Sequence, residues 1–170
     1  MNFEESTIKC IEIINEALGR IGAEKIADNL SFSIKPELLF PDYVKYSVDS
    51  PDALHMELII TSDSLQVDLE DMSELYEWSL SQLSDNRAEV IQVLADLFSC
   101  TVEVERCGNN YRKLRFFDVN DECVRTTKYV SGLYLPFRCE KQKYAPHFGV
   151  DVGGADVEAR RDAELPRTSK

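Results

Sequence analysis

Residues 54–70, LHMELIITSDSLQVDLE, decide the fold because apolar and polar side chains alternate along most of their length. A period of two is typical of strands that bury one face, and Ser62 and Asp63 interrupt it with residues that favour turns. The pattern predicts a β-hairpin. A slip of one residue would turn one strand inside out, so the apolar faces select a single register. That register pairs Ile60 with Leu65, Leu58 with Val67 and Met56 with Leu69.

The predicted register also sets Glu57 directly opposite Asp68 on the solvent face of the hairpin. Like charges in opposite positions destabilise a sheet. We therefore expect compensation, either from a cationic partner or from basic strands elsewhere in the fold. His55 falls opposite Glu70, which favours a structural pairing over a role in binding or pH response.

A second hairpin is predicted over residues 100–118, around a three-residue loop at 108–110 with the sequence GNN. Gly and Asn tolerate the left-handed backbone that such loops require. Matching the apolar faces pairs Val104 with Leu114 and Val102 with Phe116. On the other face this register sets Glu105 opposite Lys113 and Glu103 opposite Arg115, which are complementary cross-strand pairs.

Three helices are expected from the helical spacing of apolar residues. The first spans residues 3–21, between an N-cap at Asn2 and a C-cap at Gly22. The second begins at Asp71-Met72-Ser73-Glu74, which matches a capping box, and the third begins near Arg87 after a break at residues 84–86. The predicted inward residues are Ile8, Ile11, Ile14, Leu18 and Ile21 in the first, Met72, Tyr76, Leu80 and Leu83 in the second, and Ile91, Leu94, Leu97 and Phe98 in the third.

Further strands are expected at residues 43–48, 123–130 and 133–139, and Pro136 indicates that the last lies at a sheet edge. The prediction is an α+β fold in which an antiparallel sheet of hairpins packs against about three helices. Residues 1–148 are expected to form a single domain. Residues 149–170 have little to bury and are expected to form a flexible or weakly helical tail.

Charge limits the classes of partner that the protein can bind. The 170 residues carry a net charge of −12, which repels phosphate backbones and anionic lipid headgroups. No run approaches the roughly 20 apolar residues that span a bilayer, and the start MNFEESTIKC does not resemble a signal peptide. We expect a cytoplasmic protein that binds neither nucleic acid nor membrane.

The residues that usually carry chemistry form no recognisable motif. The two histidines, His55 and His147, lie outside nucleophile and metal motifs, and no glycine-rich phosphate loop is present. Five cysteines without a C-x-x-C pair argue against a disulfide framework or a zinc ribbon, so we expect reduced thiols. These are Cys10, Cys100, Cys107, Cys123 and Cys139. No catalytic residue, cofactor or metal site is predicted.

Acidic side chains are concentrated in one part of the chain. Residues 1–105 hold 22 acidic and 6 basic side chains, whereas residues 106–143 hold 4 and 9. Between Lys45 and Arg87 there are ten carboxylates and no Lys or Arg. A solvated acidic face is one interpretation, and a docking surface for a basic protein is the other. The residues assigned to that surface are Glu57, Asp63, Asp68, Glu70, Asp71, Glu74, Glu77 and Trp78.

We expect a non-enzymatic binding module that neutralises or escorts a basic toxin or effector. In size, charge and lack of catalytic motifs the chain is similar to small acidic bacterial immunity proteins. The alternatives are a type III secretion-like chaperone, a phage-type inhibitor that imitates DNA charge, and an enzyme whose site is assembled only in the fold. The first of these is disfavoured because the chain is predicted to end in strands and a tail, where such chaperones carry a helix.

Overall fold

The computed structural model describes residues 3–26, 34–40, 43–48, 50, 52–108, 110–131 and 138–149, and the statements below concern these residues. Three helices and nine strands form in the order α1 (Phe3–Arg20), β1 (Ile34–Phe40), β2 (Tyr43–Val48), β3 (Met56–Thr61), β4 (Ser64–Leu69), β5 (Met72–Ser79), α2 (Leu80–Asp85), α3 (Arg87–Ser99), β6 (Thr101–Cys107), β7 (Tyr111–Phe117), β8 (Cys123–Val130) and β9 (Cys139–Tyr144).

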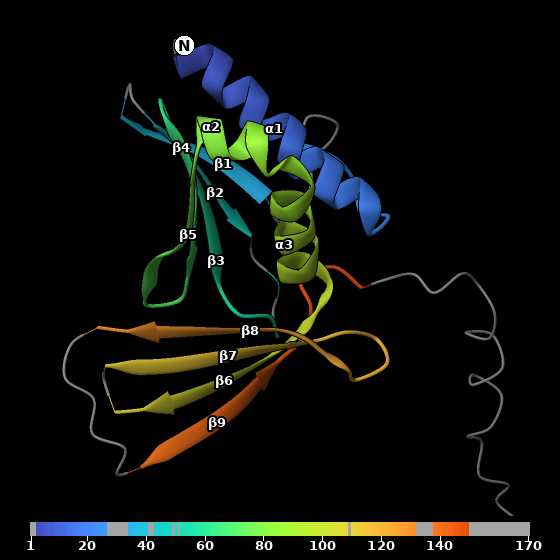
Figure 1. Ribbon diagram of the computed structural model, residues 1–170, viewed down its shortest axis with the longest axis vertical. Helices are drawn as coiled ribbons and strands as arrows, with labels where there is room; N and C mark the ends of the chain where they lie inside the picture. The colour runs from blue at the N-terminus through green and yellow to red at the C-terminus, as the bar shows by residue number, and fades with distance from the viewer. Residues whose placement is uncertain are drawn as a thin grey trace, which may run out of the picture.

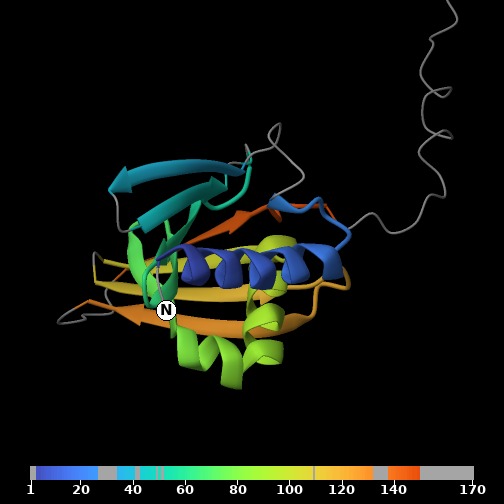
Figure 2. The ribbon, with the colours of Figure 1, turned by 90° about the horizontal axis from the view of Figure 1, so that it is seen from above.

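The strands form two antiparallel sheets, with the orders β1-β2-β3-β4-β5 and β8-β7-β6-β9. In Figure 1 the first sheet lies above the second, and the strands of the two sheets run crosswise. Seen from above, in Figure 2, α1 lies between the β1–β2 strands and the α2–α3 pair. The predicted α+β class is confirmed. The two predicted hairpins, however, belong to different sheets.

Both hairpins have the predicted registers. In the first, β3 and β4 pair Ile60 with Leu65 and Glu57 with Asp68. In the second, β6 and β7 pair Val104 with Leu114 and Glu103 with Arg115 across a loop that contains Gly108 at φ +63°. The alternation of buried and partly buried residues along all four strands gives the reason, because only these registers bury both apolar faces.

The other strand predictions have mixed outcomes. Strands β2 and β8 have the predicted bounds. The last described strand, β9, lies later than expected, at Cys139–Tyr144, and it occupies an edge of the second sheet. The edge position was predicted from Pro136, which lies outside the described residues. Most of the predicted strand at 133–139 falls outside the described residues, as does the tail beyond residue 149.

The predicted helix beginning at Met72 is wrong. Residues Met72–Ser79 form β5, which pairs with β4, and the helix begins only at Leu80 behind a capping box formed by Ser79 and Gln82. Both Met72 and Tyr76 pair with apolar residues of β4. Their separation of four is even, so it places two side chains on one face of a strand as well as on one face of a helix.

Helix α1 ends as predicted, at a left-handed Gly22 with φ +74°. Most of its predicted inward face is confirmed, because Ile14 and Leu18 are buried and Ile11 and Ile21 pack partly buried against the core. The predicted inward residue Ile8 is 54% exposed. The face that packs inward follows the spacing Cys10, Ile13, Ile14, Ala17 and Leu18. It begins at Ser6, a fully buried serine whose hydroxyl donates to the Ser62 carbonyl at 2.7 Å. This hydrogen bond connects the helix to the turn between β3 and β4.

One hydrophobic core cluster joins the helices to both sheets. It includes Leu58 of β3, Leu94 of α3 and Leu114 of β7. Polar contacts reinforce the junction, since Arg125 of β8 donates to Asp96 of α3 at 2.8 Å and the Tyr76 hydroxyl bonds with Thr127. The two sheets are therefore held in a fixed relation.

Candidate functional site

The predicted acidic surface maps onto one meander of three neighbouring strands. Glu57 lies on β3, Asp63 in the turn before β4, and Asp68 on β4. Glu70 and Asp71 form the turn between β4 and β5. The remaining three residues, Glu74, Glu77 and Trp78, lie on β5, which is the edge strand of the first sheet.

Glu57 has counterions that the sequence analysis did not find. Lys45 Nζ on the neighbouring strand β2 lies 2.7 Å from Glu57 Oε1, and His55 Nε2 lies 3.3 Å from the same oxygen. Partial burial raises the pKa of Glu57, but the hydrogen bonds and positive charges of Lys45 and His55 outweigh burial and lower it below its ordinary value. The like-charge pairing of Glu57 with Asp68 is therefore compensated within the sheet.

Glu70 and Asp71 are also compensated, by arginines of the second sheet. Arg106 of β6 forms an ion pair with Glu70, and Arg112 of β7 donates to Asp71 Oδ2 at 2.8 Å. Two sources of compensation were expected, a cationic partner or basic strands of the fold. The second applies to Glu70 and Asp71, and Lys45 of β2 compensates Glu57. Lys45 and the two arginines lie far from these carboxylates along the chain, and the sheets bring them together.

Four carboxylates of the meander, in contrast, have no Lys or Arg within ion-pair distance among the described residues. Asp63 Oδ1 accepts a hydrogen bond from Thr61 at 2.8 Å, and Glu77 Oε1 accepts one from Gln66 at 3.1 Å. Asp68 Oδ1 accepts from the backbone N–H of Glu74 at 2.7 Å. Glu74 itself is exposed and has a left-handed backbone with φ +54°. We call Asp63, Asp68, Glu74 and Glu77 the acidic edge.

Trp78 does not extend freely from this edge. Its indole stacks on the ring of Tyr76, with centroids 5.7 Å apart, and it packs partly buried against the hydrophobic core. Burial raises the pKa of Tyr76, whose hydroxyl bonds with Thr127 of β8. These two aromatic residues thus connect β5 to the second sheet.

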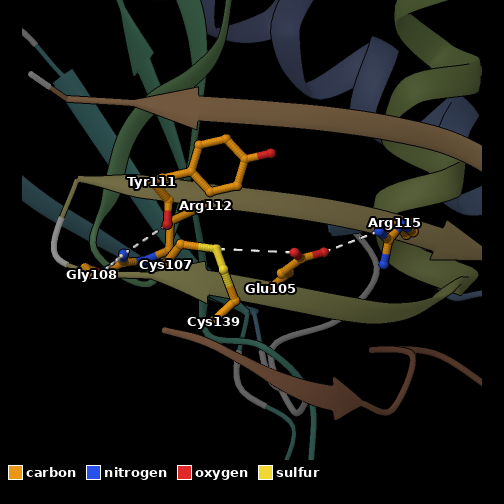
Figure 3. Close-up of a disulfide and its surroundings, with 7 residues drawn as sticks. All are labelled: Glu105, Cys107, Gly108, Tyr111, Arg112, Arg115 and Cys139. Carbon is orange, nitrogen blue, oxygen red and sulfur yellow. Dashed lines mark hydrogen bonds and ion pairs between the residues drawn. A yellow bond between two sulfur atoms is a disulfide. The ribbon is translucent and has the colours of Figure 1, made fainter. Parts of the chain in front are cut away.

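The second notable site is a disulfide between Cys107 of β6 and Cys139 of β9 (Figure 3). The two residues are direct partners in the antiparallel ladder, with Cα atoms 4.2 Å apart. The expectation of five reduced thiols is therefore wrong for this pair. The free cysteines are Cys10, Cys100 and Cys123. The sequence did not predict this pairing, because the two cysteines are 32 residues apart and the last strand was expected at residues 133–139 rather than at Cys139–Tyr144.

A carboxylate lies beside the disulfide. Glu105 Oε1 is 4.0 Å from Cys107 Sγ, and ligand atoms of Glu105, Cys107 and Cys139 all lie within 4.8 Å of one another. The other oxygen, Glu105 Oε2, accepts a hydrogen bond from Arg115 at 3.0 Å, as Figure 3 shows. Arg115 also pairs with Glu103. No motif predicted this cluster, because the ladder between β6 and β9 creates it.

A groove of about 590 Å³ runs along α1 and is lined by Glu12, Asn15, Glu16, Gly19, Arg20 and Lys25. This lining contains carboxylates and cations but no serine, cysteine or histidine, so it does not offer a nucleophile paired with an imidazole base.

None of the helices in the described part of the chain has both the length and the apolar character needed to cross a membrane. Comparison with known proteins gave no match to any family model, curated protein or solved structure.

Proposed function

We propose that the protein is a non-enzymatic binding module that docks a basic protein segment on its acidic edge, Asp63, Asp68, Glu74 and Glu77. The observation that carries the proposal is the division among the carboxylates of the meander. Glu57, Glu70 and Asp71 have counterions within the fold, whereas the acidic edge has none among the described residues. A cationic partner would supply them.

The position of Glu74 and Glu77 on an edge strand, with Asp68 on the neighbouring strand, indicates how a partner would bind. Strand β5 is an edge of the first sheet, and no other described strand pairs with its outer side. Addition of an extended segment to a sheet edge gains affinity from main-chain hydrogen bonds and specificity from side chains. A segment with alternating basic residues would place its cations against Asp68 and Glu77, which share the outer face.

Backbone strain at Glu74 supports the same assignment. A non-glycine residue with a left-handed backbone costs about 1–2 kcal/mol, and such strain concentrates at binding sites. Here the Asp68 carboxylate holds the Glu74 backbone through its N–H, at 2.7 Å. The contact keeps the Glu74 side chain at the edge of the sheet, where it is exposed.

The partner is a basic toxin or effector domain, as the charge of the chain predicted, and the module neutralises or escorts it. Long-range attraction would accelerate association at low ionic strength, because the screening length falls from about 30 Å at 0.01 M salt to about 8 Å at 0.15 M. Salt dependence of the association rate is thus a direct property of this mode of binding.

The test uses a synthetic peptide of alternating lysine and valine as a basic extended probe, with a glutamate–valine peptide as its counterpart. Amide NMR shifts of the isotopically labelled protein are followed during titration with each peptide. We expect the lysine peptide alone to shift resonances of residues 72–79, with an affinity that falls as salt is added. The substitutions Asp68→Lys and Glu74→Lys together should abolish this response and leave the other resonances in place.

The matched control carries Glu24→Lys and Asp52→Lys, which change the net charge by the same amount at exposed positions away from β5. It should bind the lysine peptide nearly as well as the parent at 0.15 M salt. If both double variants lose binding equally, attraction depends on net charge alone, the acidic edge is a solvated face, and the proposal fails.

A further inference from the structure

We propose that Glu105, Cys107 and Cys139 bind a thiophilic divalent cation such as Zn²⁺ once the disulfide is reduced. The cluster is independent of the acidic edge, because it lies on β6 and β9 of the second sheet. The disulfide and the metal-bound, reduced cysteines would then be two alternative states of the same three residues.

The distances within the cluster suit a tetrahedral ion. Zinc–sulfur bonds of about 2.3 Å and zinc–oxygen bonds of about 2.0–2.2 Å place neighbouring ligand atoms about 3.5–3.8 Å apart. Glu105 Oε1 and Cys107 Sγ are already 4.0 Å apart, and all three ligand atoms lie within 4.8 Å of one another. The two sulfurs are bonded to each other here, so after reduction their side chains must rotate apart to hold an ion, while the ladder pairing keeps Cys107 and Cys139 adjacent.

Charge and hydrogen bonding also favour the site. Two thiolates and one carboxylate carry three negative charges, one more than a divalent cation neutralises. Arg115, which also pairs with Glu103, partly offsets the charge of Glu105: the guanidinium donates to Glu105 Oε2 at 3.0 Å and leaves Oε1 turned toward Cys107. A fixed partner of this kind orients a ligating carboxylate.

Three protein ligands leave a fourth position open on a tetrahedral ion, as in zinc sites that keep a bound water. Cys107 is only 2% exposed, whereas Cys139 is exposed at the edge strand. An ion would therefore enter from the Cys139 side and hold its fourth, exchangeable ligand there.

The switch between the two states follows from thiol chemistry. A dithiol reductant transfers two electrons and two protons: the Cys107–Cys139 sulfur–sulfur bond breaks, and a sulfur–sulfur bond forms in the reductant. Binding of the cation then displaces the two thiol protons to solvent. A disulfide oxidant reverses the change: its own sulfur–sulfur bond breaks as it accepts the two electrons, the Cys107–Cys139 bond forms, and the ion leaves because neither sulfur remains a thiolate.

The other cysteines provide internal controls. Burial raises the pKa of Cys10 to about 12 and of Cys100 to about 11, so both remain thiols at neutral pH. Cys123 is exposed on β8, which is separated from β9 by the whole width of the second sheet. Replacing Cys123 should therefore leave the site unchanged.

The experiment titrates Co²⁺ into the full chain, reduced with a dithiol that is then removed under anaerobic conditions. We expect one equivalent to bind with a thiolate-to-cobalt charge-transfer band and the visible bands of a tetrahedral ion, and one equivalent of Zn²⁺ to bleach them. The oxidised protein should show no such band. Glu105→Gln should weaken Co²⁺ binding at least about tenfold while the charge-transfer band persists at saturation.

Replacing Cys107 and Cys139 together with serine should abolish the signal, whereas Cys123→Ser should preserve it. Circular dichroism of each variant separates loss of the site from loss of the fold. Three outcomes would overturn the proposal: a disulfide that resists reduction in the folded protein, a reduced protein without the charge-transfer band, or a band that persists in the double serine variant.

Discussion

Arg112 Nη2 lies 2.8 Å from Asp71 Oδ2, so a largely buried cation of β7 in the second sheet reaches the turn between β4 and β5 in the first. Arg106 makes the equivalent bridge to Glu70. The basic strands of the chain thus neutralise part of its acidic segment within the fold. Among the described carboxylates of the β3–β5 meander, those without such partners are the residues of the acidic edge, Asp63, Asp68, Glu74 and Glu77.

The two residues of the Arg112–Asp71 pair should differ in importance. The Asp71 side chain is 60% exposed, so Asp71→Asn should lower the free energy of unfolding by less than about 1 kcal/mol. Arg112 also donates to the carbonyls of Gly108 and Tyr111, and Arg112→Met should cost about 2 kcal/mol because all three contacts are lost. Urea denaturation of the two variants measures both values. Equal costs would show that the ion pair, rather than the carbonyl contacts, supplies the stability.

The Cys107–Cys139 disulfide should stabilise the protein against unfolding. Closing a loop between residues 32 positions apart restricts the unfolded chain by an amount worth about 3–4 kcal/mol. Reduction, or replacement of both cysteines by serine, should lower the urea midpoint accordingly in the presence of a chelator. Non-reducing peptide mapping checks the pairing. An unchanged midpoint after complete reduction would contradict the prediction.

The Lys45–Glu57 pair should make stability depend on pH in a defined direction. The pKa of Glu57 in the folded protein lies below its ordinary value of 4.5, so its stabilising effect is complete above pH 4.5 and is lost as the pH falls through the lower folded value. Lys45→Met removes the strongest partner. The difference in unfolding free energy between parent and variant should therefore shrink below pH 4.5, as measured by urea denaturation across a pH series. A constant difference down to pH 2 would be inconsistent with this assignment.

Glu74→Gly should stabilise the fold by about 0.5–1 kcal/mol, because glycine adopts a left-handed backbone without the clash that a Cβ atom causes. The backbone N–H bond to Asp68 is retained. Glu77→Gly on the same strand, where φ is negative, should instead destabilise by a similar amount. Thermal unfolding compares the two. Under the proposed function, both variants bind the lysine peptide more weakly, which separates the loss of charge from the change in stability.

Much of the local structure followed from the sequence. The registers of both hairpins, the start of α3, and strands β2 and β8 were predicted correctly. Only one pairing of two alternating strands buries both apolar faces, and several neighbouring residue pairs in each hairpin specify that same register. The prediction for β5 was wrong for an equally local reason. Met72 and Tyr76 fit the periods of both a helix and a strand, and residues Asp71 to Glu74 resemble a helix capping box.

What the sequence by itself determined, then, was the two hairpins, strands β2 and β8, and the surplus of negative charge, whereas β1, β5 and β9 were not predicted. Only the tertiary structure decided which carboxylates are neutralised, since Lys45, Arg106 and Arg112 reach Glu57, Glu70 and Asp71 across strands and sheets. It also decided that Cys107 faces Cys139 beside Glu105. The physical reason is that ion pairs, disulfides and ligand clusters depend on distances of a few ångströms between residues tens of positions apart. Periodicity and spacing along the chain carry no record of those distances.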